Sequence, residues 1–182
     1  MLSQHIHDAG LVARANAALL RQGITALTEM DARQFGVSPR EDASPVGAHF
    51  RHVLEHYQAF LAGLEEGRID YDARPRDPRI EQDAEIAIAV AEQIAVRLDL
   101  MERQRPRWGQ VFINAASEAG LLDAHDWAAS TVARELGFLL SHTIHHYALI
   151  RLLAADHGVR LDADFGVAPS TLQHRERARC AH

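Results

Sequence analysis

Cysteine, excess positive charge and long apolar runs are all scarce in this sequence, and each absence excludes a class of protein. Cys180 is the single cysteine, so neither a disulfide framework nor a thiolate zinc site can form within one chain. Any bound metal would therefore be held by His, Asp or Glu. The formal net charge of -6 argues against a nucleic-acid partner, because phosphate contacts require clustered Lys and Arg.

Hydrophobic residues make up 47% of the chain, but they never gather into the run of about 18 apolar residues that a membrane span requires. The N-terminus also lacks the basic and apolar regions of a signal peptide. We therefore expect a cytoplasmic protein without a membrane partner. A length of 182 residues indicates one domain over residues 1–182, with a core of about residues 11–158 and a tail over residues 159–182.

Apolar side chains recur at helical spacing in four segments. Residues suited to capping precede three of them, namely Ser44, Asp77 and Ser130, and Gly67 and Gly158 stand where helices commonly end. Such helices, joined by connections of modest length, predict an all-α four-helix bundle. The predicted helices cover residues 11–30, 45–66, 78–103 and 131–156.

Outside these helices the pattern is weaker. Residues 69–79, rich in Asp, Arg and Pro, are expected to form a loop. Gln110–Asn114 could form a short strand, against which residues 126–128 return as an irregular hairpin before the last helix. Tyr57 and Tyr147 are expected to pack with hydrated hydroxyls. In the first helix, the positions predicted to face the core are Leu11, Ala15, Leu19, Ile24 and Leu27.

Histidine is abundant, with 12 residues, and its placement points to a site. His142 and His146 are four residues apart, so on a helix their side chains lie on a single face. Because that face is otherwise largely apolar, both imidazoles are predicted to be buried, which costs about 1 to 3 kcal/mol for a group without a partner. The pair either binds one metal ion or consists of core histidines bonded to carboxylates or carbonyls. The same face carries Glu135, Leu139, Leu149 and Leu153.

A second row of histidines, His49, His52 and His56, flanks the apolar face of the second helix. His52 lies furthest from the centre of that face, so helical geometry ranks it below the other two. One imidazole added to the pair on the last helix would make a three-nitrogen site with an open position, as in catalytic zinc centres. Such a site suits Zn, Ni, Co or Fe(II). The Glu-x-x-His and His-Glu-x-x-His motifs are absent, which excludes the common di-iron and zinc-protease patterns.

Two motifs in this order resemble the DinB-like superfamily: SPVGAHFRH at residues 44–52, and His142-x-x-x-His146 on the last helix. The resemblance implies a four-helix bundle that binds a divalent metal ion through one histidine of the second helix and the pair of the fourth. Carried over residue by residue, the implied ligands are His52, His142 and His146. His49 and His56 are the alternates, or groups that orient a ligand. The implied metal is Zn or Ni foremost, with Fe, Co and Mn as alternatives.

Known enzymes of that superfamily include metal-dependent transferases and isomerases that use low-molecular-weight thiols. The resemblance therefore implies a metal-dependent thiol transferase or hydrolase-like enzyme, a small-molecule substrate and a homodimer. The alternative is a non-catalytic metal-binding, small-ligand-binding or structural bundle. Glu135 is a candidate to orient a ligand or accept a proton, unless it is only a charge at the end of the bundle. Tyr147-Ala148-Leu149 replaces the Arg-Gly-Gln that often follows the second histidine, which weakens any transfer of substrate.

Overall fold

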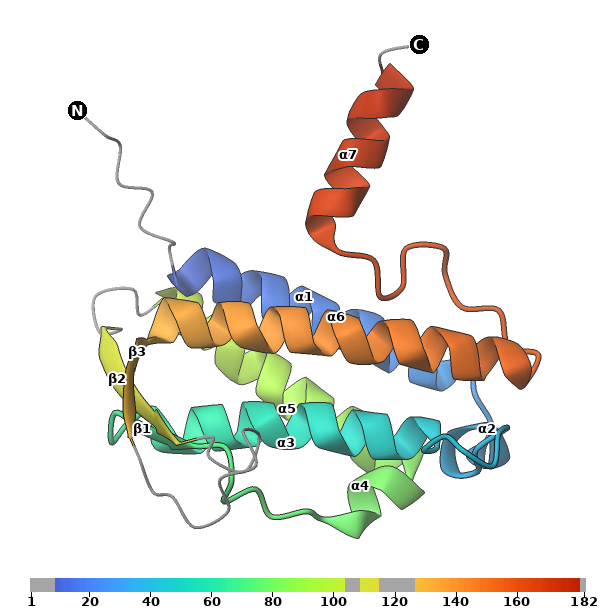
Figure 1. Ribbon diagram of the computed structural model, residues 1–182, viewed down its shortest axis with the longest axis horizontal. Helices are drawn as coiled ribbons and strands as arrows, with labels where there is room; N and C mark the ends of the chain where they lie inside the picture. Colours follow the sequence, from blue (N-terminus) through green and yellow to red (C-terminus); the bar gives the residue numbers. More distant parts are fainter. Residues whose placement is uncertain (1–8, 104–108, 115–126, 181–182) are drawn as a thin grey trace.

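The computed structural model describes residues 9–103, 109–114 and 127–180. This part of the chain is mostly helical, as predicted, and carries a small three-stranded sheet (Figure 1). Its elements are α1 (Ala9–Thr28), α2 (Ala32–Gly36), α3 (Val46–Gly63), β1 (Arg68–Asp70), α4 (Pro78–Gln82), α5 (Ala84–Arg103), β2 (Gln110–Asn114), β3 (Ala128–Thr131), α6 (Val132–Asp156) and α7 (Pro169–Cys180).

The four long helices enclose the hydrophobic core. α1 packs against α5 and α6, and α3 packs against the same two helices. The predicted apolar face of α3 is buried, because its large side chains recur every three or four residues and meet their neighbours on one side. α5 supplies small residues that allow close approach. The residues of these two faces include Val46, Phe50, Val53, Tyr57, Phe60, Ala87, Ala91 and Ala95.

The structure corrects the inward face that the sequence predicted for α1. Leu11 is 47% exposed, whereas Leu27 is buried as predicted. The buried face is lined by small residues that carry little periodic signal, and Gly23 shows why they are small. A Cβ at Gly23 would collide with the hydroxyl of Tyr147, so only glycine allows this approach. The buried residues of α1 are Gly10, Ala13, Asn16, Ala17, Leu20, Gly23, Ala26 and Leu27.

Two of the three predicted N-caps are wrong. The N-cap of α3 is Pro45, without a side-chain hydrogen bond, so Ser44 does not cap it. The N-cap of α6 is Thr131, whose hydroxyl accepts from the backbone N–H of Arg134 at 3.2 Å. Asp77 does cap its helix, as predicted, by accepting from a backbone N–H two residues later.

The helix ends also differ in part from the prediction. The third predicted helix is divided at Asp83, whose extended backbone separates α4 from α5 and whose carboxylate accepts from the N–H of Glu85 at 2.9 Å. α3 ends at Gly63, before the predicted Gly67. α6 ends as predicted before Gly158, which has a positive φ of 78° that suits glycine.

The sheet lies at one end of the long helices (Figure 1). β2 and β3 pair antiparallel, so a strand pair before the last helix is present, but the returning strand is Ala128–Thr131 and shares only Ala128 with the predicted residues 126–128. Asp126, part of the predicted return, lies outside the described residues. β1 pairs parallel with β2 and was missed, because three residues at the start of an expected loop are too few to show an alternation of apolar and polar side chains. The expected connector after α1 likewise contains the short helix α2.

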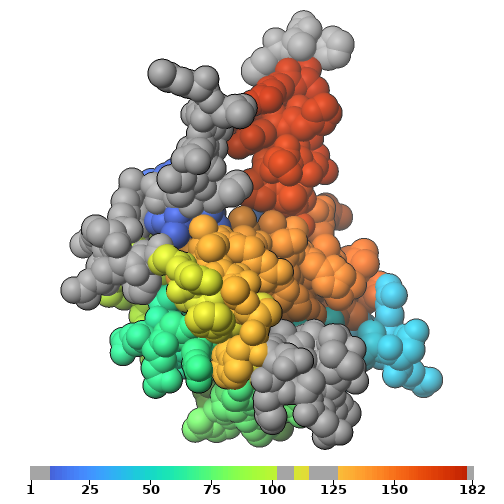
Figure 2. Space-filling model, turned by 60° about the vertical axis from the view of Figure 1, so that its left-hand side comes forward, coloured from blue at the N-terminus to red at the C-terminus, as the bar shows by residue number. Residues whose placement is uncertain are grey.

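The C-terminal tail first covers the core and then leaves it. Phe165 stacks on Tyr147 with ring centres 4.7 Å apart. Beyond this contact, α7 projects from the body of the molecule (Figures 1 and 2). Among the described helices, none is long and apolar enough to cross a membrane.

Candidate metal centre

The candidate histidines lie on α3 and α6, two helices that pack against each other and run antiparallel (Figure 1). The sequence predicted His142 and His146 on the buried face of α6, and the structure corrects this. The fully buried residues are instead Thr143 and Tyr147, one position further along the chain, while the two histidines are half-buried at the edge. This edge position gives the imidazoles access to solvent that a core position would deny them.

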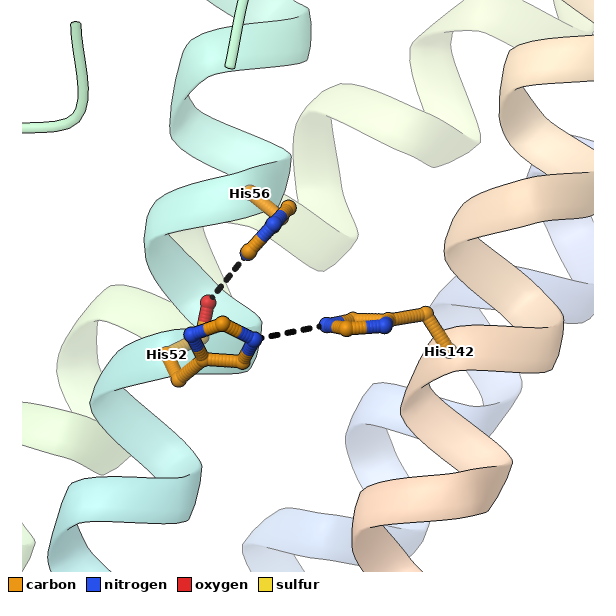
Figure 3. Close-up of side chains that lie close together, drawn as sticks. All are labelled: His52, His56 and His142. Atoms are coloured by element: carbon orange, nitrogen blue, oxygen red, sulfur yellow. Dashed lines mark hydrogen bonds between the residues drawn. The ribbon is translucent and has the colours of Figure 1, made fainter. Parts of the chain in front are cut away.

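Three imidazoles form a compact group. Nitrogen atoms of His52, His56 and His142 all lie within 4.8 Å of one another. The side chains of His52 and His142 point toward each other between the helices (Figure 3), and their Nε2 atoms are 2.9 Å apart. Two nitrogens bound to one tetrahedral zinc ion at its usual bond length lie about 3.3 Å apart. The donor set and its spacing therefore fit a divalent metal ion.

His146 lies beside this group. Its ring centre is 4.6 Å from that of His142 and 4.7 Å from that of His52. Nδ1 of His146 is 2.9 Å from Nδ1 of His49, so one ring nitrogen of His146 is engaged across the helices. His145 is exposed. The implied ligand set of His52, His142 and His146 stays a prediction, with His56 as a competing member.

The imidazoles of His52, His56 and His146 are held neutral at neutral pH, because their pKa values are lowered. Burial lowers the pKa of His52 to about 3, and positive charge on the neighbouring His56 and His142 adds to the effect. Burial also lowers the pKa of His146 to about 3 and that of His56 to about 4. A metal ion binds the neutral imidazole, so at neutral pH these rings need not release a proton first.

Two residues of the loop after β1 contact the histidines, and neither carries a periodic signal in the sequence. Nη1 of Arg74 is 3.1 Å from Nε2 of His56 and also donates to the carbonyl of Tyr71 at 2.5 Å. The ring of Tyr71 lies 5.7 Å from that of His56. Phe138, on α6, stacks on His142 at 5.4 Å between ring centres. The site thus has an aromatic wall, and Arg74 places a positive charge beside His56.

Glu135 is fully buried, so it is not a solvated charge at the end of the bundle. Its carboxylate accepts from the hydroxyl of Tyr71 at 3.0 Å, from the hydroxyl of Ser130 at 2.5 Å and from Nη1 of Arg134 at 2.8 Å. Burial, followed by the charge of Glu135, raises the pKa of Tyr71. The hydroxyl therefore stays protonated and links Glu135 to the aromatic wall beside His56.

Comparison with known proteins gives one family and one partial relative. The family model described as the DinB superfamily matches residues 18–150, well over half of the chain. The chain is similar to FK506-binding protein 5 of Rhizopus delemar, with 43% identity over 53 residues. That alignment covers 29% of this chain and 14% of the relative, so the chain spans only a small part of that protein. No solved structure matches the chain significantly.

Proposed function

Because the chain belongs to the DinB superfamily, we propose that it is a divalent-metal-dependent enzyme that activates a thiol or a water molecule for attack on a small electrophile. The observation that carries this proposal is the 2.9 Å approach of Nε2 of His52 to Nε2 of His142 at a half-exposed edge between α3 and α6. A bound divalent metal ion supplies an activated nucleophile, because coordination lowers the pKa of a water molecule or thiol.

In this proposal His52, His142 and His146 hold the metal, which is Zn or Ni foremost. Nδ1 of His146 faces Nδ1 of His49, which leaves Nε2 of His146 for the metal. A ligating imidazole that donates its other N–H to a neighbour is fixed in orientation, and His49 has this role. Glu135 positions the aromatic wall of the site and not a metal ligand, since it accepts from Tyr71, whose ring lies against His56.

One observation favours a second candidate, a non-catalytic metal-binding protein. Tyr147 begins the segment that replaces the family's frequent Arg-Gly-Gln. It is fully buried and stacks on Phe165. This residue therefore serves packing and does not reach a thiol or its substrate. The two candidates share the metal site and differ in turnover.

The first prediction concerns metal content. Untagged protein purified without chelator should contain about one equivalent of a divalent metal, measured by elemental mass spectrometry. His142→Ala should lose that metal, because removal of one of three ligands breaks the site. The matched control is His145→Ala, which removes an exposed imidazole of the same helix and should keep the metal.

Unchanged occupancy in His142→Ala would refute the ligand assignment, and wild-type protein that takes up neither Zn nor Ni would refute the metal site. Loaded protein should then be tested with low-molecular-weight thiols and electrophiles. Turnover that disappears in His142→Ala supports the enzyme, whereas full occupancy without turnover on any pair favours the binding protein. The homodimer, also a proposal, is tested by light scattering.

A further inference from the structure

His56 is the most buried imidazole of the cluster, with 1% exposure, and its protonation can be read from its contacts. Nδ1 of His56 is 2.7 Å from the carbonyl oxygen of His52 (Figure 3). A carbonyl oxygen can only accept a hydrogen bond, so Nδ1 carries the proton. In a neutral imidazole the other nitrogen, Nε2, then holds the lone pair. Nε2 is therefore the atom through which His56 would bind a metal.

The lone pair on Nε2 of His56 faces the positively charged side chain of Arg74. Nη1 of Arg74 lies 3.1 Å from Nε2 of His56. A guanidinium has donors and no acceptor, so Arg74 is the donor and His56 the acceptor. The same nitrogen of Arg74 donates to the carbonyl of Tyr71, which holds the guanidinium beside Nε2 of His56. A metal ion and Arg74 would need the same lone pair.

We propose that Arg74 withholds His56 from coordination and thereby keeps one position of the metal open. The inference rests on the proposed function. Four imidazoles, His52, His56, His142 and His146, could complete a tetrahedral set, and a completed set is typical of structural sites. A nitrogen of His56 already lies within 4.8 Å of nitrogens of His52 and His142. What separates an open three-histidine site from a closed one is thus the hydrogen bond from Arg74.

The test uses the full chain loaded with Co(II), whose visible absorption reports its ligands, and azide as a probe of an open position. In the wild type, azide should shift the absorption bands. In Arg74→Met, which keeps an unbranched apolar stem, His56 should fill the position. The affinity of the variant for Co(II) should then rise roughly tenfold, a change that corresponds to the free energy of about one hydrogen bond. Its absorption bands should no longer respond to azide.

The double variant Arg74→Met/His56→Ala decides whether His56 is the cause. It should return to the wild-type affinity and azide response. If it instead keeps the tighter binding, the effect of Arg74 is only charge repulsion and the inference is overturned. Arg76→Met, an exposed arginine of the same loop, is the control for net charge and should behave as the wild type.

A single His56→Ala variant tests the same inference with Arg74 in place. If Arg74 withholds His56, Co(II) affinity should stay within about threefold of the wild type. A loss of roughly 10-fold or more, in the range typical of a lost ligand contact, would make His56 a ligand and overturn the inference. Wild-type protein that binds Co(II) and responds to azide, beside an unchanged Arg74→Met, defeats this inference alone. Wild-type protein that binds no Co(II) defeats the proposed function as well.

Discussion

Two polar clusters lie against neighbouring faces of α6, and they differ in their hydrogen bonding. On the core face, Asn16, Tyr57 and Thr143 are fully buried. The hydroxyl of Tyr57 donates to Oδ1 of Asn16 at 2.6 Å and lies 3.0 Å from the hydroxyl of Thr143. Nδ2 of Asn16 donates to the carbonyl of Leu136 at 3.0 Å, and Thr143 donates to that of Leu139 at 2.7 Å. In this core network, each of these hydroxyl and amide donors has a carbonyl or amide oxygen as its acceptor.

On the other face, imidazole rings of α3 pair with imidazole rings of α6. His52 pairs with His142 and His49 pairs with His146, each at 2.9 Å between nitrogens. Without a metal, each such pair shares one proton between two lone pairs, and both rings are half-buried. The core network stabilises the helix contacts by ordinary hydrogen bonding. The histidine face concentrates lone pairs at a solvent-accessible edge, which is the arrangement that a cation stabilises.

The largest effect should come from breaking the core network. Asn16→Ala removes all three hydrogen bonds of the side chain, to the carbonyls of Val12 and Leu136 and from the hydroxyl of Tyr57. The free energy of unfolding should therefore fall by roughly 2 to 3 kcal/mol. Urea denaturation measures this change. The affinity for Co(II) should stay as in the wild type, because the two clusters are separate.

The control is Leu11→Ala, at an exposed position of the same helix. It should change the free energy of unfolding by no more than about 0.5 kcal/mol. A loss of metal affinity in Asn16→Ala as large as that of His142→Ala would contradict the division into a structural and a functional cluster.

The periodicity of the sequence predicted the buried face of α3 correctly. It did not predict which of the two neighbouring faces of α6 is buried. The apolar residues around Phe50 and Tyr57 are large and regularly spaced, so their burial was predictable. On α6, the predicted stripe contains Leu139, His142 and Leu153. The buried Thr143 lies one residue after His142 and therefore on the neighbouring face of the helix. The packing of Tyr147 against Gly23 fixes that rotation, and a contact between distant helices cannot be read from one helix's pattern.

Prediction of the histidine site has the same limit, because contacts between distant parts of the chain cannot be read from the pattern of one helix. The spacing of His142 and His146, together with the histidine row on the second helix, is enough to identify the two helices that carry the cluster. The contact of Arg74 with His56 spans a loop of irregular sequence, for which no periodic rule exists. The sequence placed Glu135 on the predicted buried face, but it could not predict the partners of that carboxylate, because Tyr71 and Ser130 come from the loop after β1 and from β3. Sequence patterns thus locate the helices of the candidate site, while long-range contacts determine which ring nitrogens already have a partner in the protein.

The pH dependence of stability should sharpen the comparison. The folded pKa values of His52 and His146, about 3, lie below the value of about 6.5 for an unfolded histidine. Below about pH 6.5 the unfolded chain therefore binds more protons than the folded chain. The metal-free protein should lose stability as the pH falls from about 6.5 toward 4, and these groups should contribute no slope above about pH 7.

Because both rings are half-buried, the slope per histidine should stay below the limit of about 1.4 kcal/mol per pH unit. Urea denaturation of chelator-treated protein at about pH 7 and about pH 5 measures it. His146→Ala should show a smaller loss between the two values, whereas Asn16→Ala should show the wild-type loss. Equal losses in His146→Ala and the wild type would mean that this imidazole titrates normally in the folded state.

The smallest effect concerns Tyr57 and Tyr147, both of which were predicted from the sequence to be packing residues with hydrated hydroxyls. Both hydroxyls are buried instead. That of Tyr57 belongs to the core network, whereas within the described residues that of Tyr147 has no hydrogen-bond partner. An unpaired buried hydroxyl costs free energy, so Tyr147→Phe should raise the free energy of unfolding by up to about 1 kcal/mol. Tyr57→Phe should lower it by a similar amount. Urea denaturation of the two variants side by side measures the difference, and a loss of stability in Tyr147→Phe would reveal a bond to that hydroxyl.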